Sequence, residues 1–218
     1  MNQEKLAYFL GVLQTDGKLT TYNTIKRNKV YRRTDIGLKV GKKSFQMLKQ
    51  FQRSLKELYG RDINIHESKD GFFDIHTSVN KLLETFKEQG IGKIGIPDWI
   101  KQSESNFGAH LAGVIDGDGN VRVKRPKYPQ HMIRISDGKF NEDLLKLINE
   151  FMKCKVTTSK NCRFSVFRDG RTTYGRWYDY DICISRKNAI FINKHVLPFM
   201  TINYKKELIN KGVQQKLN

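Results

Sequence analysis

The sequence is poor in cysteine and acidic residues, and it has no long run of apolar residues. Its 218 residues include only three cysteines, Cys154, Cys162 and Cys183. Because no two of them have Cys-x-x-Cys spacing and their number is odd, neither a disulfide framework nor a zinc site is indicated. No apolar stretch approaches the ~18 residues of a membrane span, and the first residues lack a signal-peptide pattern. We therefore expect an intracellular protein, in the cytoplasm or in an organelle, with no membrane partner.

The shortage of acidic residues leaves a large excess of positive charge. The chain has 40 lysines and arginines against 22 aspartates and glutamates, a formal net charge of +18. Solubility alone needs only a modest net charge, so this excess indicates a polyanionic partner. Nucleic acid is favoured over a membrane surface, because no basic amphipathic helix stands out.

Two short segments resemble each other about a hundred residues apart. Residues 9–17 read FLGVLQTDG, and residues 111–119 read LAGVIDGDG. Each predicts an apolar helix with a central glycine and an acidic residue at its C-terminal end. Such a repeat indicates two similar halves, so Asp16 and Asp118 could meet where the halves join. Paired carboxylates in a basic chain predict metal-dependent chemistry on a polyanion.

Hydrophobic periodicity predicts the same order of elements in both halves: helix, two strands, helix, two strands, helix. In the first half we expect helices at 4–13, 44–59 and 78–86, and strands at 18–26, 30–40, 63–67 and 72–77. In the second half we expect helices at 107–115, 142–152, 188–195 and 204–211, and strands at 120–124, 132–136, 163–168 and 177–185. The fold class is therefore α+β, with an N-terminal half at 1–89, a linker at 90–105 and a C-terminal half at 106–218.

Basic residues concentrate in the predicted strands and their turns. Alternation with period two lets one face of a strand pack on helices while the other presents charge. A two-stranded ribbon fits the major groove of DNA, where arginine pairs with guanine. An ordinary solvated sheet explains any single strand equally well, but it does not explain why all the hairpins are basic. The residues predicted to contact DNA are Lys26, Arg32, Arg33, Lys39, Arg122, Lys124, Arg134, Arg163, Arg168 and Arg176.

Residues 111–119 resemble the LAGLIDADG signature of homing endonucleases almost letter for letter, and residues 9–17 resemble a degenerate copy. The order of elements is also similar to that family, so the resemblance covers nearly the whole chain. Two motifs in one chain imply the monomeric form with pseudo-two-fold symmetry. The implied fold has two αββαββα halves, whose antiparallel sheets form a DNA-binding saddle and whose motif helices pack together. Gly11 and Gly113 would let these helices approach closely.

The resemblance implies a site-specific endonuclease that cuts both strands of double-stranded DNA. Its target would be long and asymmetric, roughly 20 base pairs, and cleavage would leave short 3′ overhangs. Asp16 and Asp118 would be catalytic metal ligands, joined by the backbone carbonyls of Thr15 and Gly117. Mg²⁺ is the expected ion, with Mn²⁺ or Ca²⁺ as substitutes in binding, because two close carboxylates repel unless a hard cation lies between them.

The family also places a basic residue near the metal, at the end of the second strand of each half. The matching residues are Lys43, with Lys42 as its alternative, and Lys139. Each would polarise water or stabilise the transition state, or would merely contact a phosphate. Asp137 is a candidate to hold a bridging water.

The first motif departs from the signature, because Gln14 stands where the second motif has Asp116. In the family this position caps and packs the helix, so we expect both copies to be competent. If Asp116 also faced the metal, the site would be asymmetric.

Three other interpretations compete with a nuclease. An EF-hand at residues 116–127 fails, because Val121 replaces the required glycine and Lys127 replaces the bidentate glutamate. An intron RNA maturase and a DNA-binding regulator without cleavage both remain open on the same fold. Intact Asp16 and Asp118 argue against a pure binder but not against a maturase, for which intron RNA would be a partner.

Overall fold

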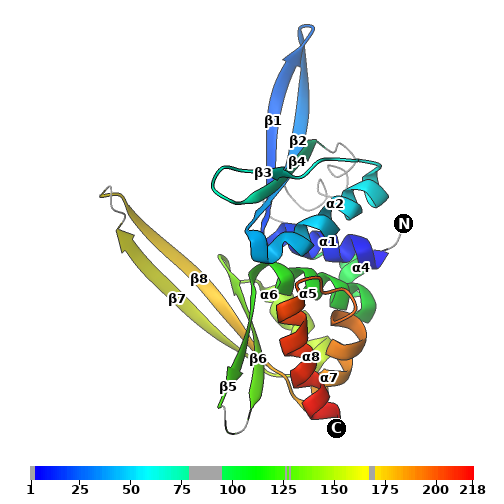
Figure 1. The fold of residues 1–218 in the computed structure, drawn as a ribbon, viewed down its shortest axis with the longest axis vertical. Helices are drawn as coiled ribbons and strands as arrows, with labels where there is room; N and C mark the ends of the chain where they lie inside the picture. Colours follow the sequence, from blue (N-terminus) through cyan, green and yellow to red (C-terminus); the bar gives the residue numbers. More distant parts are fainter. Residues whose placement is uncertain (1–2, 79–94, 126, 128, 167–169) are drawn as a thin grey trace.

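The computed structural model describes residues 3–78, 95–125, 127, 129–166 and 170–218. Figure 1 shows two halves stacked along the long axis, which meet at α1 (Gln3–Thr15) and α5 (Glu104–Asp118). Each half has a four-stranded antiparallel sheet, and the strand orders β1-β2-β4-β3 and β5-β6-β8-β7 are equivalent. The predicted α+β fold of two pseudo-symmetric halves joined at two packed helices is confirmed.

The first half continues from α1 with a long hairpin, one amphipathic helix and a short second hairpin. Its elements are β1 (Gly17–Lys26), β2 (Lys29–Val40), the 3-10 turn η1 (Lys42–Ser44), α2 (Phe45–Tyr59), β3 (His66–Glu67) and β4 (Phe73–Ser78). Phe51 of α2 stacks on Phe9 of α1 with ring centroids 4.5 Å apart, which fixes α2 beside the motif helix. The helix predicted at 78–86 lies outside the described residues.

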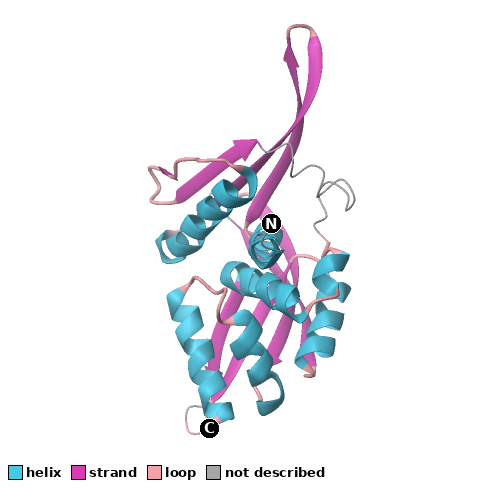
Figure 2. Cartoon of the chain, turned by 90° about the vertical axis from the view of Figure 1, so that its right-hand side faces the viewer, coloured by secondary structure: helices cyan, strands magenta, loops and turns pink. Residues whose placement is uncertain are grey.

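The second half repeats this order with a longer second hairpin, and it has more helices among the described residues. Its elements are α4 (Asp98–Lys101), β5 (Gly119–Lys124), β6 (Gln130–Asp137), α6 (Glu142–Met152), β7 (Val156–Val166), β8 (Thr172–Cys183), α7 (Arg186–Phe191), the π-helical turn η2 (Ile192–Val196) and α8 (Asn203–Leu217). Figure 2 shows its helices in front of its strands, so the core lies between these two layers. None of the helices in the described ranges is both long and apolar enough to cross a membrane.

Several boundaries differ from the sequence-based expectation. The strand expected at 163–168 begins instead at Val156 and pairs with β8 along its full length. The helix expected at 188–195 begins at Arg186 and changes to π-helical geometry from Ile192. The described part of the predicted linker, 95–105, contains α4 and the start of α5. Val156 is the one buried residue in this extension, and residues 157–162 have no buried side chain, so they carry no hydrophobic alternation that could have identified them.

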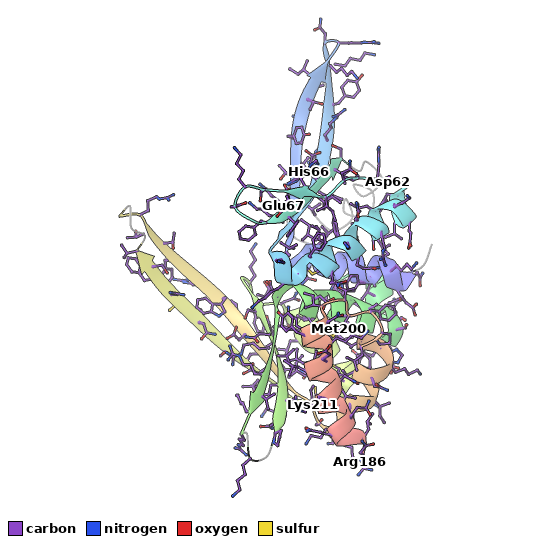
Figure 3. All side chains as sticks on the ribbon, viewed as in Figure 1. Asp62, His66, Glu67, Arg186, Met200 and Lys211 are labelled. Carbon is purple, nitrogen blue, oxygen red and sulfur yellow. The ribbon has the colours of Figure 1, made fainter. Side chains whose placement is uncertain are left out.

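Strand register divides each sheet into a face covered by helices and an open face. In the second half, Ile135 of β6 and Tyr180 of β8 pair directly and are buried against the helices. Their neighbours Arg134 and Asp181 also pair and point to the open face. The hairpins β1–β2 and β7–β8 project beyond the helices as ribbons with side chains on both faces (Figure 3). Both open faces are therefore broad, solvent-facing surfaces on either side of α1 and α5.

Candidate functional site

The two motif helices are in backbone contact at their glycines. A Cβ atom on Gly11 would lie 2.2 Å from the carbonyl oxygen of His110, and one on Gly113 would lie 2.3 Å from that of Tyr8. Because these neighbours are backbone atoms, no side-chain rotation could relieve the overlap. The structure thus places the two glycines predicted to pack the helices at their closest approach.

This packing brings Asp16 and Asp118 to the same end of the helix pair. Asp118 is the last residue of α5, and Asp16 directly follows α1. The Oδ2 atom of Asp16 lies 3.4 Å from the position that a Cβ on Gly117 would occupy, so it lies beside the end of α5. Both aspartates keep an exposed surface, although the surrounding protein partly encloses their carboxyl groups. The junction therefore presents two carboxylates to solvent, one from each half.

The two carboxylates lie in an environment that disfavours their charged forms. Burial, together with the negative charges of Asp16 and Asp137, raises the pKa of Asp118 to about 6. Burial also raises the pKa of Asp16. Like charges that share a site disfavour each other's ionisation, so this pair is costly in the absence of a cation.

Lys205 of α8 is a charged residue at this site that the sequence interpretation missed. Its side chain is buried, with only 4% of the residue exposed. Its Nζ donates hydrogen bonds to the carbonyl oxygens of Ile115, Asp116 and Gly117, at 2.9, 2.7 and 3.1 Å. The lysine thus satisfies the free carbonyls at the end of α5, where a positive charge also opposes the helix dipole.

The charge of Lys205 also acts on the carboxylates. It lowers the pKa of Asp16 and of Asp118, against the upward effect of burial. Burial lowers the pKa of Lys205 itself. One signal could have identified it: Lys205 lies on the same face of α8 as the buried Ile209 and Val213, where a solvated lysine would not be expected.

One of the two backbone carbonyls predicted to bind the metal already accepts a hydrogen bond. Gly117, whose carbonyl is a predicted metal ligand, accepts the bond from Lys205, but a carbonyl oxygen has a second lone pair. Thr15 uses its hydroxyl within α1, where Oγ1 donates to the carbonyl of Val12 at 3.1 Å. Their carbonyls stay predicted ligands. Within the described ranges, no group of three or more His, Cys, Asp or Glu side chains could hold a metal ion.

Asp116, in contrast, points into the protein. Its Oδ2 accepts hydrogen bonds from the hydroxyl of Tyr8 at 2.8 Å and from the backbone N–H of Thr201 at 2.7 Å. The Thr201 hydroxyl lies 2.9 Å away, and the N–H of Ile202 donates to Oδ1 at 3.4 Å. The loop that supplies these donors follows Met200, which is labelled in Figure 3. Asp116 therefore ties this loop to both motif helices and does not face the junction opening.

The lysines predicted near the metal are exposed. Lys43 lies in η1, and Lys139 follows β6. The backbone N–H of Lys139 donates to Oδ1 of Asp137 at 3.0 Å. Lys139 and Asp137 line a groove of about 740 Å³ that also contacts Gln14 of the first half. Their chemical roles stay predictions.

Register sorts the predicted DNA-contacting residues onto two faces. Those on the open faces are Lys26, Arg33, Lys39, Arg122, Lys124, Arg134 and Arg163. Arg32 is four residues from the buried Ile36 on β2, so its side chain points to the face that the helices cover. Arg176 is likewise four residues from the buried Tyr180 on β8 and points to the covered face of its sheet. Arg168 lies outside the described residues.

Comparisons by sequence and by structure give different results. No protein-family model and no curated protein matches the sequence. The structure is similar to the I-LtrWI LAGLIDADG homing endonuclease bound to target DNA, with a TM-score of 0.57 and 13% identity, covering 98% of this chain and 91% of that chain. It is also similar to I-DmoI in complex with DNA and Ca, with a TM-score of 0.60 and 15% identity, covering 96% and 98%.

A third similar structure is the meganuclease I-SmaMI bound to uncleaveable DNA, with a TM-score of 0.54 and 13% identity, covering 99% of this chain and 92% of that chain. All three structural similarities cover both halves of this chain. The resemblance seen in the two nine-residue motifs is thereby confirmed for the fold: this chain has the two-half fold of the LAGLIDADG homing endonucleases.

Proposed function

We propose that this protein is a monomeric, site-specific DNA endonuclease that cuts both strands of a long asymmetric target. The observation that carries the proposal is the placement of Asp16 and Asp118 at the ends of α1 and α5, with one carboxylate from each half. The basic open faces of the two sheets lie on either side of this pair. Structures with the same fold hold DNA, which supports duplex DNA as the substrate.

The carboxylate pair fits a hard divalent cation. Asp16 and Asp118 would hold Mg²⁺ from opposite helices, with water and phosphate oxygens completing its coordination. Mn²⁺ or Ca²⁺ would substitute in binding, and the similar I-DmoI structure was solved with Ca. When bound, such an ion activates water and stabilises the leaving oxygen of a phosphodiester. The raised pKa of Asp118 is consistent with a site completed by positive charge.

The chain's own residues would orient the reaction. Lys205 holds the last turn of α5 and therefore the position of Asp118. Basic residues on the open faces would neutralise backbone phosphates and contact base edges. Lys43 and Lys139 would polarise water or stabilise charge on the phosphate. Cleavage of one strand at each carboxylate, across the minor groove, would leave short 3′ overhangs in a target of roughly 20 base pairs.

The test is cleavage of a randomised duplex-DNA library in Mg²⁺. We expect the unmutated protein to enrich one long sequence, and the Asp16→Asn and Asp118→Asn variants to bind it without cutting both strands. Double-strand cleavage retained in both single variants would contradict the assignment. Sequence-specific binding without cleavage by the unmutated protein would favour a regulator, and preferential binding of intron RNA would favour a maturase.

A further inference from the structure

An arginine on the open face of the second sheet is held by two carboxylates. Arg134 of β6 pairs in register with Asp181 of β8. Its Nε and Nη2 atoms donate to Oδ1 and Oδ2 of Asp181, both at 2.6 Å. Its Nη1 forms an ion pair with Oδ2 of Asp179 at 3.2 Å. A bidentate pair with a second carboxylate fixes the plane of the guanidinium as well as its position.

The carboxylates in this cluster are more enclosed than the arginine side chain. Asp179 also accepts hydrogen bonds from the Ser136 hydroxyl at 2.6 Å and from Nδ2 of Asn161 at 3.0 Å. The side chains of Asp179 and Asp181 are 7% and 13% exposed, against 22% for Arg134. A guanidinium has five N–H groups, and these contacts leave some of them available. The cluster therefore offers hydrogen-bond donors to a ligand, while each of its carboxylate oxygens already has at least one partner.

Arg134 lies close to the carboxylate pair at the junction. Arg134 of β6 also pairs with Asn120 of the neighbouring strand β5, and Asn120 is two residues beyond Asp118 in the sequence. With about 3.3 Å per strand residue, this offset is about 7 Å along β5. A duplex that lies along the open face has base pairs about 3.4 Å apart, so Arg134 would face the groove a few base pairs from the cut.

We propose that Arg134 contacts a guanine in the half-site covered by the second sheet, and that Asp179 and Asp181 are positioning residues for this contact. The inference rests on the proposed function, since it requires duplex DNA on the open face. Guanine presents two acceptors, O6 and N7, in the major groove, which match paired N–H donors. A lysine, with one compact ammonium, has no such planar match.

Charge explains why the cluster serves specificity more than affinity. Two carboxylates beside one guanidinium leave a local charge of −1, so the cluster adds nothing to general attraction for phosphates. Arg122 and Lys124 lie on the same face and supply positive charge there. A free arginine loses rotamer entropy when it binds, whereas Arg134 is ordered beforehand. Arg134 therefore binds well only to a base whose acceptor atoms match the fixed position of its N–H groups.

Among the described residues of the first half, the position equivalent to this cluster is occupied by other groups. Lys18 follows Asp16 by two residues, as Asn120 follows Asp118, and it pairs with Gly37. A Cβ on Gly37 would lie 2.5 Å from Nδ1 of His76, whose ring covers this position. His76 in turn forms an ion pair with Asp74 at 3.2 Å. The two half-sites would therefore be contacted by different groups near the cut, which requires an asymmetric target.

The test measures binding and does not depend on cleavage. The full-length protein is used in Ca²⁺ to select its target from a random duplex library. Affinities are then measured for every single base-pair change in that target. We expect one guanine to be preferred about 5- to 150-fold, which corresponds to 1–3 kcal/mol for a bidentate contact. Arg134→Lys and Asp181→Asn should each reduce that preference at least fivefold and leave preferences in the other half-site unchanged.

Matched variants keep the outcome decisive. Asp74→Asn on the first sheet also removes one carboxylate from an open face, and it should leave the guanine preference intact. If Asp181→Asn fails to fold, Asp181→Glu keeps the charge while displacing the guanidinium, and it should also weaken the preference. If the unmutated protein selects a target but Arg134→Lys and both Asp181 variants keep its full profile, the inference is overturned and the proposed function stands. If the unmutated protein selects no sequence, both are overturned.

Discussion

Tyr8 and Asp116 belong to opposite halves and are joined by a hydrogen bond of 2.8 Å from the phenol to Oδ2. Residues 8 and 110 are equivalent in the repeat, as are residues 14 and 116. The equivalent contact joins His110 and Gln14, whose Nε2 and Oε1 atoms are 2.9 Å apart. The pseudo-two-fold axis thus relates two bonds of different chemistry. Two unlike bonds hold the motif helices in register above the carboxylate pair.

The Tyr8 bond should contribute measurably to stability. Tyr8→Phe removes one donor from a buried carboxylate, which keeps its bonds to Thr201 and Ile202. Loss of a hydrogen bond to a charged group should lower the free energy of unfolding by about 1.5–3 kcal/mol. Urea denaturation measures this difference, with Tyr204→Phe on the exposed side of α8 as the matched control. Equal stabilities for the two variants would show that the bond is not stabilising.

Acid should destabilise the protein through His110. Burial lowers the pKa of this fully buried histidine to about 4. Because the unfolded chain takes up the proton first, stability is complete above the unfolded pKa of about 6.5 and falls as the pH drops toward 4. The loss should be about 1.4 kcal/mol per pH unit, or about 3 kcal/mol in total.

His110→Gln isolates this effect, because all other titrating groups are shared with the unmutated protein. Stability is measured by urea denaturation at several pH values from 7 to 4. The unmutated protein should lose stability more steeply than His110→Gln over this interval. Parallel pH profiles would contradict the assigned pKa.

Removing one of the paired carboxylates should stabilise the metal-free protein. Burial and the charge of Asp16 raise the pKa of Asp118 to about 6, so its ionised form costs stability above that pH. The cost disappears below the unfolded pKa of about 3.9. In chelator at pH 7.5, Asp118→Asn should therefore have a higher Tm, by about 2–4 °C per kcal/mol of repulsion removed.

The gain should shrink as the pH approaches 4, and divalent cation should raise the Tm of the unmutated protein only. Glu67→Gln, an exposed change on β3, is the control for loss of one negative charge. A lower Tm for Asp118→Asn at pH 7.5 would show that burial and the charge of Asp16 impose no such cost on the ionised Asp118.

Lys205 should be needed for both stability and cleavage. Lys205→Met keeps the length of the side chain but removes the donor to three carbonyls of α5. Leaving these groups unsatisfied should cost about 1–3 kcal/mol. Cleavage of the selected target should also fall, because the end of α5 that positions Asp118 loses this support; a tenfold loss would correspond to about 1.4 kcal/mol of transition-state stabilisation.

The neighbouring Lys206→Met is the control, because the Lys206 Nζ reaches only the carbonyl of Met200, at 3.4 Å. DNA binding should be similar in both variants. Unchanged cleavage by Lys205→Met would remove this residue from the site.

The sequence predicted those parts of the fold that repeat or alternate. The two nine-residue motifs indicated the glycine contact and the location of Asp16 and Asp118. The bounds of α6 were predicted correctly, since an apolar stripe follows Asn141, whose side chain caps the helix by accepting from the N–H of Leu144 at 3.0 Å.

Features that depend on tertiary contacts could not be predicted in this way. Residues 157–161 of β7 are held by pairing with β8, and no buried side chain marks them. Lys205 looks like an ordinary helix lysine until α8 packs beside α5. Arg32 and Arg33 look alike in sequence, yet strand alternation sends them to opposite faces.

The position of Lys205 in the chain has a consequence for protein synthesis. Among the described elements α8 is the last to leave the ribosome, and it carries the ammonium that holds the end of α5. A chain released before residue 205 would contain both aspartates and both sheets, but it would lack the ammonium that binds the carbonyls of Ile115, Asp116 and Gly117. Residues up to at least Lys205 must therefore be synthesised before the end of α5, and Asp118 with it, can take the position described here.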